Sequence, residues 1–273
     1  YDGSDGTARE TLRQLVRRGW VRGGSHGAVT LENSLPSELP LSRRLLALPR
    51  EDGRPMQIER IPFPPIGSNM YVVTQGRDAI VLDPWPDEAT MQRLQGYHAL
   101  IVLTHEHIDH ISGLGRMQRA LSARTLWQEN CTPWLRNPGN TTPVLLAALS
   151  VSRGAEARDF LRGLHLKTET YAPDMTFGDH IALDWGALHL EGYATPGHSR
   201  GSACYRIGPD AFFSGDSLVP GFAVITRLRG GDAAVLMDRT VPFLRALPPA
   251  LTLYPGHGRC GMSLGEGLGS MDW

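Results

Sequence analysis

The stretch Leu100-Ile101-Val102-Leu103-Thr104-His105-Glu106-His107-Ile108-Asp109-His110 joins an apolar run to three histidines and an aspartate. The apolar run is typical of a strand that is buried on both faces. Imidazole and carboxylate are ligands that suit zinc, iron and manganese. Along an extended segment, His105, His107 and Asp109 point to one side and span about 13 Å, too far for a single ion. The segment must therefore curl, or there must be two ions.

Three later segments repeat this design, in which a strand is followed by a glycine or threonine and then by a His or Asp. They are Thr195-Pro196-Gly197-His198, Ser214-Gly215-Asp216 and Tyr254-Pro255-Gly256-His257. Glycine permits the tight turn and the close backbone approach that a ligand loop needs. Four such loops in one chain are far less expected by accident than any lone histidine. The pattern therefore predicts that the loops meet in one metal site.

With these motifs the chain resembles the metallo-β-lactamase superfamily over about residues 56–260. The resemblance implies an α/β fold, a four-layer αββα sandwich of two mixed sheets flanked by helices, with two divalent metal ions at its edge. The ligands that it implies are His105, His107 and His198 for the first ion, Asp109, His110 and His257 for the second, and Asp216 between the two. Asp83, at the end of Val81-Leu82-Asp83, matches the acid that orients ligands from behind them.

Two ions that share a water would lower its pKa from 15.7 to about 7. Hydrolysis by a metal-bridging hydroxide is the mechanism that the resemblance implies, and it needs no serine or cysteine nucleophile. Asp109 is the candidate catalytic residue, because its carboxylate can accept a proton as the bond breaks. Zinc is the metal we expect first, and iron and manganese suit the same ligands.

Within the superfamily, residues 195–202 and 213–218 resemble the glyoxalase II-like branch. Asp216 stands where the classical zinc β-lactamases carry a cysteine. The branch implies a thioester or a related activated acyl substrate. The chain ends soon after His257, without the helical domain that grips glutathione in that branch, which favours an acyl group on a carrier or coenzyme. Alternatives are a lactam, lactone or phosphodiester hydrolase, an iron-dependent persulfide dioxygenase and a non-enzymatic binding module.

The pattern identifies no substrate-binding residue. Tyr193, Arg200 and Tyr254 flank expected ligands and are candidates to hold a substrate oxygen. Nothing in the sequence favours one of the three over the others.

The formal net charge of −1 over 273 residues provides no global field toward nucleic acid or an anionic membrane. No apolar run is long enough to span a membrane. Three cysteines form neither a zinc-type pair nor a disulfide framework. We therefore expect a cytoplasmic protein that acts on a small-molecule or carrier-bound acyl substrate, without a nucleic-acid or membrane partner. The sequence does not predict the oligomeric state.

Three regions are expected along the chain. Residues 1–55, with a helix over 7–19 and a hairpin over 20–31, form an N-terminal extension or a small accessory module. Residues 56–260 form the main domain, with a helical insertion at about 129–175 that serves as a lid or an outer layer. Residues 261–273, rich in glycine, form a flexible tail. The expected strands are 58–62, 69–74, 78–83, 100–104, 124–128, 187–194, 203–207, 211–214 and 251–254, and the expected helices are 87–95, 111–120, 144–151, 155–164 and 232–247.

Overall fold

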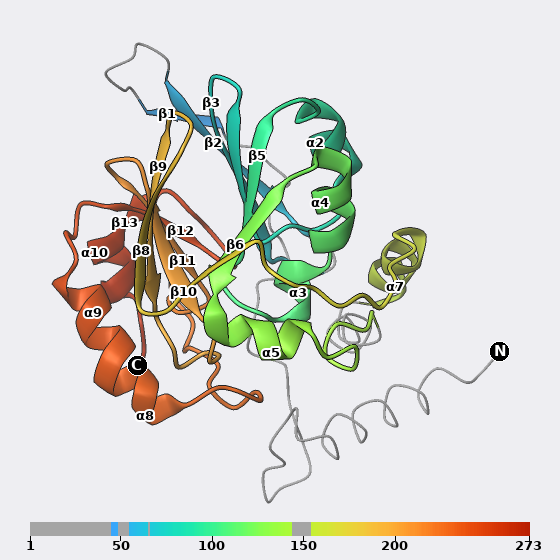
Figure 1. Cartoon of the computed structure of the whole chain (residues 1–273). Coiled ribbons are helices and arrows are strands. Elements are labelled where there is room, and N and C mark those ends of the chain that lie inside the picture. The colour runs from blue at the N-terminus through green and yellow to red at the C-terminus, as the bar shows by residue number, and fades with distance from the viewer. Residues whose placement is uncertain (1–44, 49–54, 65, 144–153) are drawn as a thin grey trace, which may run out of the picture.

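Two mixed sheets face each other between two outer layers of helices, which confirms the predicted αββα sandwich (Figure 1). The computed structural model describes residues 45–48, 55–64, 66–143 and 154–273. The expected helices over 7–19 and 144–151 and the hairpin over 20–31 lie outside these residues.

The first sheet has seven described strands, and the second has six. In spatial order, the first sheet consists of β1 (Leu45–Leu48), β2 (Met56–Pro62), β3 (Asn69–Gln75), β4 (Asp78–Leu82), β5 (His98–Val102), β6 (Arg124–Gln128) and β7 (Met175–Phe177). The second sheet consists of β13 (Met262–Ser263), β12 (Thr252–Pro255), β11 (Ala211–Gly215), β10 (Ala203–Ile207), β9 (Leu188–Ala194) and β8 (His180–Trp185). Strands β4 to β7 pair in parallel, as do β11 and β12, and the remaining pairs are antiparallel.

Helices cover the outer face of each sheet (Figure 1). Those that follow strands of the first sheet are α2 (Glu88–Arg93), α3 (Ile108–Ile111), α4 (Leu114–Leu121), α5 (Thr132–Leu135) and α7 (Gly154–Gly163). Those beside the second sheet are α8 (Ala233–Val235), the π-helical turn η3 (Leu236–Thr240), α9 (Val241–Ala246) and α10 (Leu264–Gly269). No helix in the described part of the chain is both long and apolar enough to cross a membrane.

Strand β5 explains why the apolar run of the opening stretch is continuous. Leu100 and Val102 belong to the core between the two sheets, whereas Ala99, Ile101 and Leu103 belong to the core beneath the helices of the first sheet. A strand with core on both faces has no polar face to alternate with. This burial fixes β5 firmly, so the histidines that follow it start from a rigid position.

Several elements differ from the sequence prediction for identifiable reasons. The expected helix over 232–247 is divided into α8, η3 and α9, because Pro242 has no N–H to donate to the carbonyl one turn earlier. Strands β7 and β8 lie in a stretch where no strand was expected, and β8 alternates between half-buried and exposed side chains up to Trp185.

The described structure extends the main domain beyond both expected boundaries. Strand β1 pairs with β2, so part of the expected N-terminal extension completes the first sheet. The expected flexible tail instead contains β13, which pairs with β12, and α10. Ser263 and Glu266 form a capping box at the start of α10, and Leu264 is fully buried. Because the segment is rich in glycine, the sequence did not predict the Ser263–Glu266 cap or the burial of Leu264.

Gly113 packs against the loop that follows β4, and we expect Gly113→Ala to destabilise the fold. A Cβ at this position would lie 2.3 Å from the carbonyl carbon of Trp85 and 2.6 Å from the nitrogen of Pro86. Because both neighbours are backbone, the free energy of unfolding should fall by about 2–3 kcal/mol, measured by urea denaturation. Gly163→Ala is the matched control, since its Cβ would meet nothing within 4 Å. An equal loss in both variants would contradict the packing argument.

Candidate metal centre

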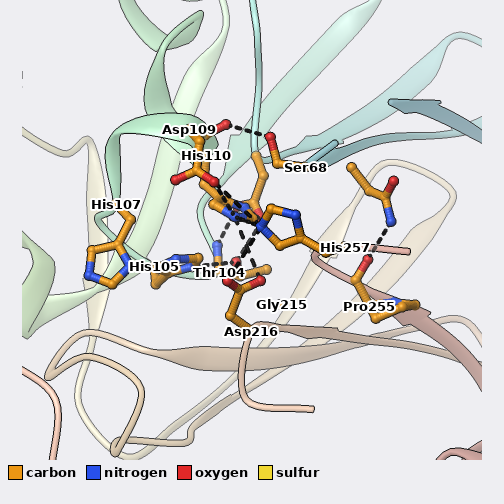
Figure 2. A network of polar contacts seen from close by, with 12 residues as sticks. Ser68, Thr104, His105, His107, Asp109, His110, Gly215, Asp216, Pro255 and His257 are labelled. Atoms are coloured by element: carbon orange, nitrogen blue, oxygen red, sulfur yellow. Dashed lines mark hydrogen bonds and ion pairs between the residues drawn. The ribbon is translucent and has the colours of Figure 1, made fainter. Parts of the chain in front are cut away.

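The seven residues expected to bind metal all lie at one end of the two sheets, as Figure 2 shows for six of them. Those after β5 come from the first sheet, and the others come from loops at the ends of strands in the second sheet. The two sets meet where Ser68 forms a β-bridge with His257. His107, Asp216 and His257 remain partly exposed, so the cluster opens to solvent on one side.

The first group of possible ligands consists of His105, His107 and His198, whose donor atoms lie within 4.8 Å of one another. His107 Nδ1 and His198 Nε2 are 2.9 Å apart. The other ring nitrogen of His198, Nδ1, donates to the carbonyl of Ile225 at 2.8 Å. That bond assigns the proton of His198 to Nδ1, so its Nε2 lone pair faces the group.

The second group consists of Asp109, His110 and His257, whose donor atoms also lie within 4.8 Å of one another. Asp109 Oδ2 is 3.4 Å from His257 Nε2 and 3.5 Å from His110 Nε2. The loop therefore curls after His107, where helix α3 begins, and this turn carries Asp109 and His110 away from the first group.

Asp216 lies between the two groups. Its Oδ2 is 3.6 Å from His198 Nε2 in the first group and 3.5 Å from His257 Nε2 in the second. Gly215 and Gly256 permit this position. Gly215 has φ +50°, and a Cβ at Gly256 would lie 2.1 Å from Asp216 Oδ1.

Asp83 lies beneath both groups and connects them. Its Oδ2 accepts from His110 Nδ1 at 2.9 Å and from Thr104 Oγ1 at 2.6 Å, and its Oδ1 accepts from the Thr104 amide at 2.7 Å. Because the Thr104 hydroxyl proton goes to Asp83, its oxygen accepts from His105 Nδ1 at 3.1 Å. The Nε2 atoms of His105 and His110 are thereby turned toward the cluster.

Most of the shifted protonation states in the cluster suit cation binding, but His110 holds a proton that a cation would have to displace. Burial lowers the pKa of His105, and it lowers that of His107 to about 3, so both rings are neutral at neutral pH. For Asp109 and Asp216, burial raises the pKa, but the surrounding histidines lower it by more. The net pKa of each is below the ordinary value, so both carboxyls are ionised. Burial also lowers the pKa of His110, but Asp109, Asp216 and Asp83 outweigh it and raise the value to about 10.

Unsatisfied polar atoms show that a cation fits this cluster. His105 Nε2 and Asp216 Oδ1 are buried, and neither makes a hydrogen bond within the described residues. A buried polar atom without a partner costs free energy. A divalent ion between the histidines and carboxylates would satisfy both atoms, and the donor set suits zinc, iron or manganese.

The three residues that flank expected ligands lie in different surroundings. Tyr254 is buried in the core and stacks on Phe213, so it does not face the site. Tyr193 is half-buried, and its ring lies against Phe243. Arg200 is exposed, two residues beyond His198.

Sequence reasoning missed two residues that support the site. Ser68 Oγ donates to the Asp109 carbonyl at 3.0 Å. Glu106 is buried, and its Oε2 accepts from Ser199 Oγ at 2.8 Å, which ties the β5 loop to the loop that carries His198. The sequence offered one signal for Glu106, namely its position between two expected ligands directly after a buried strand. An acid that is buried there needs hydrogen-bond partners.

Comparison with known proteins identifies relatives of the whole domain. The family described as the metallo-beta-lactamase superfamily matches residues 63–257. A probable metallo-hydrolase of Bacillus subtilis, YqgX, is 30% identical, with 74% of this chain and 90% of that protein covered. A hydroxyacylglutathione hydrolase of Anaeromyxobacter dehalogenans is 26% identical, with 68% of this chain and 60% of that protein covered. The human mitochondrial persulfide dioxygenase ETHE1 is 23% identical, with 83% of this chain and 78% of that protein covered.

Two crystal structures share the fold and more than a quarter of the aligned residues. BLEG-1, a B3 metallo-beta-lactamase, has a TM-score of 0.60 and 27% identity, with 77% of this chain and 95% of that chain covered. TTHA1623 in a di-iron-bound form has a TM-score of 0.60 and 26% identity, covering 78% and 98%. The second structure binds two iron ions in the same fold.

Proposed function

The chain belongs to the metallo-beta-lactamase superfamily, and on this premise we propose that it is a dinuclear metal-dependent hydrolase of thioesters or related activated acyl compounds. In this proposal His105, His107 and His198 would hold one ion, Asp109, His110 and His257 would hold the other, and Asp216 would contribute to both. The observation that carries the proposal is the position of Asp216, whose Oδ2 lies 3.5–3.6 Å from a histidine of each group. A single carboxylate beside two complete donor groups suits two adjacent ions.

The bound ions would acidify a shared water and polarise the scissile carbonyl. The residues of the chain prepare the site for this chemistry. Asp83 holds the His110 ring directly and the His105 ring through Thr104, so both present Nε2 without rearrangement. Asp109 stays ionised and lies at the partly exposed side of the cluster beside His257, where it can take up a proton as the bond breaks.

Two observations support an acyl substrate. Residues 195–202 and 213–218 resemble the glyoxalase II-like branch, and a hydroxyacylglutathione hydrolase is among the relatives. Asp216 provides an oxygen ligand where a thiolate would favour softer metal chemistry. We propose zinc as the metal, with iron as the alternative that the di-iron neighbour supports.

Metal removal is expected to abolish hydrolysis and to lower stability. Protein purified without added metal should contain about two ions per chain and should hydrolyse a thioester faster than a lactone or a phosphodiester. A chelator should stop turnover, and zinc or iron should restore it. Because ions that bind only the folded state stabilise it, removing them should cost about 3–4 kcal/mol of unfolding free energy for each ion, if the ions are present at 100–1,000 times their dissociation constant.

Metal analysis, a substrate panel and urea denaturation test this expectation. Thioester hydrolysis that persists in protein shown to be metal-free would contradict the proposal. So would metal-loaded protein that is active on a phosphodiester or lactone but inert toward every thioester.

The similarity to human persulfide dioxygenase supports one alternative, iron-dependent oxidation. That function predicts about one iron per chain and oxygen consumption with a glutathione persulfide. The same metal analysis, combined with an oxygen electrode, separates it from hydrolysis. Two zinc ions and no oxygen uptake would exclude it.

A further inference from the structure

Three exposed arginines near the first donor group have no carboxylate partner among the residues that the structure describes. Six other arginines of the described chain pair with an acid, namely Arg93, Arg116, Arg119, Arg162, Arg206 and Arg239. Arg200, Arg227 and Arg229 are exposed, and none makes an ion pair or a side-chain hydrogen bond with a described residue. We call these three residues the arginine rim.

The loop that carries Arg227 and Arg229 is attached to the site at both ends. The carbonyl of Ile225 accepts from His198 Nδ1 at 2.8 Å, and the amide of Asp232 donates to the carbonyl of Gly197 at 2.8 Å. Residues 217–231 contain two arginines and no acidic residue. Both arginines therefore lie between two anchors that belong to the loop of a proposed metal ligand.

The Trp134 ring of α5 neighbours both the Arg229 guanidinium and the His107 ring. The Arg229 guanidinium lies 5.9 Å from the Trp134 ring centroid, which is 6.2 Å from that of His107. These distances put the guanidinium within about 12 Å of the His107 ring. In Figure 1, α5 and the loop before α8 lie at the same end of the molecule.

Arg200 lies beside the loop of Arg227 and Arg229, and the described acids near this loop do not pair with the three arginines. Arg200 approaches the same loop, since a Cβ at Gly230 would lie 3.6 Å from its amide nitrogen. The two acids of this region have other partners. Asp232 accepts from the first amides of α8, and Glu106 is buried with Ser199 and Cys131 on its Oε2. Neither of these two acids therefore neutralises the positive charge of the arginine rim, although the whole chain has a formal net charge of −1.

We propose that the arginine rim binds an anionic group of the substrate, a carboxylate or a phosphate, beside the scissile bond. The inference rests on the proposed thioester hydrolysis and specifies its substrate class as an anionic thioester. Guanidinium groups suit this task, because they stay charged and grip both kinds of oxyanion in two-point hydrogen bonds. The Trp134 ring supports the Arg229 guanidinium and so limits its freedom before binding.

The test measures preference for anionic over neutral thioesters. S-acetylglutathione is compared with its diethyl ester, which masks the carboxylates, and acetyl-CoA with S-acetylpantetheine, which lacks the phosphates. The ratio of kcat/KM within each pair is the readout. Arg229→Gln is expected to lower the ratio about tenfold in the pair that carries the recognised anion, mainly through KM, and salt should lower it in the unaltered protein. The pair that responds identifies carboxylate or phosphate.

Matched variants separate a local effect from a general one. Arg229→Lys should restore part of the ratio, because it keeps the charge. Arg124→Gln removes an exposed arginine that has no ion pair with a described residue. It lies at the start of β6, the opposite end of the strand from the site loops. Metal content and thermal unfolding report whether each variant is intact.

Each outcome decides between the proposals. Hydrolysis without anion preference in either pair would overturn the rim and leave the hydrolase standing. An equal loss of preference in Arg124→Gln would contradict anion binding at the arginine rim. It would show instead that the overall charge of the protein causes the preference. Failure to hydrolyse any of the four thioesters in metal-loaded protein would overturn the thioester assignment, and the rim with it.

Discussion

Asp216→Ala is expected to remove bound metal and turnover together, with hydrolysis falling more than about a thousand-fold. Asp216 Oδ2 lies 3.5–3.6 Å from a histidine of each donor group. Its loss would therefore weaken both proposed ion sites at once and would leave buried histidines without their carboxylate. Metal content by mass spectrometry and the rate of thioester hydrolysis, measured on the same preparation, test the expectation.

Three variants sharpen this experiment. Asp216→Asn keeps the size of the side chain and removes its charge, so it should lose metal nearly as fully. His107→Ala should deplete the first group and abolish turnover. Asp238→Ala removes an exposed carboxylate on η3 and should behave as the unaltered protein. Hydrolysis retained by metal-free Asp216→Ala would refute the proposed mechanism.

The convergence of the site was predictable because each of its residues follows a strand end. Strands β6 and β10 have the predicted bounds. Once strands are placed, their ends gather at one edge, and the His and Asp residues there must meet. The turn of α3 after His107 was not predicted as such, because the 13 Å span left both a curl and two ions as alternatives.

Features that depend on tertiary contacts could not be predicted from local pattern. The partnership of Glu106 with Ser199 joins residues 93 positions apart, and no periodicity signals it. The same holds for the loop at 217–231, which has neither strand nor helix period, although its position beside His198 creates the arginine rim. Strand β8 alternates between half-buried and exposed residues, so its apolar signal is weak.

Asp83→Asn is expected to weaken metal binding by about 10- to 100-fold while leaving every proposed ligand in place. Asparagine has the same shape and tolerates the left-handed backbone at this position, where φ is 53°. However, its amide group cannot accept from His110, Thr104 Oγ1 and the Thr104 amide together, as the carboxylate does. The His105 and His110 rings would then lose the bonds that orient them.

The pH dependence of metal binding separates this role from a purely structural one. A metal ion at His110 Nε2 competes with a proton, so below the His110 pKa of about 10 the affinity should rise as pH rises. Asp83 is one of the carboxylates that raise this pKa. Its neutralisation should lower the value, and the pH range in which affinity rises should end at a lower pH. Competition with a chromophoric chelator across that range measures the shift.

Asp174→Asn is the matched control for this experiment, because Asp174 accepts from the amide and hydroxyl of Thr125 at 2.9 and 2.8 Å, much as Asp83 does from Thr104. It lies beside β6 and β7 and contacts no proposed ligand in these bonds. If both variants lose stability but only Asp83→Asn loses affinity and shifts the pH profile, Asp83 acts on the metal centre through the histidines that it holds. An affinity loss of equal size at every pH would show instead that Asp83 supports only the local fold.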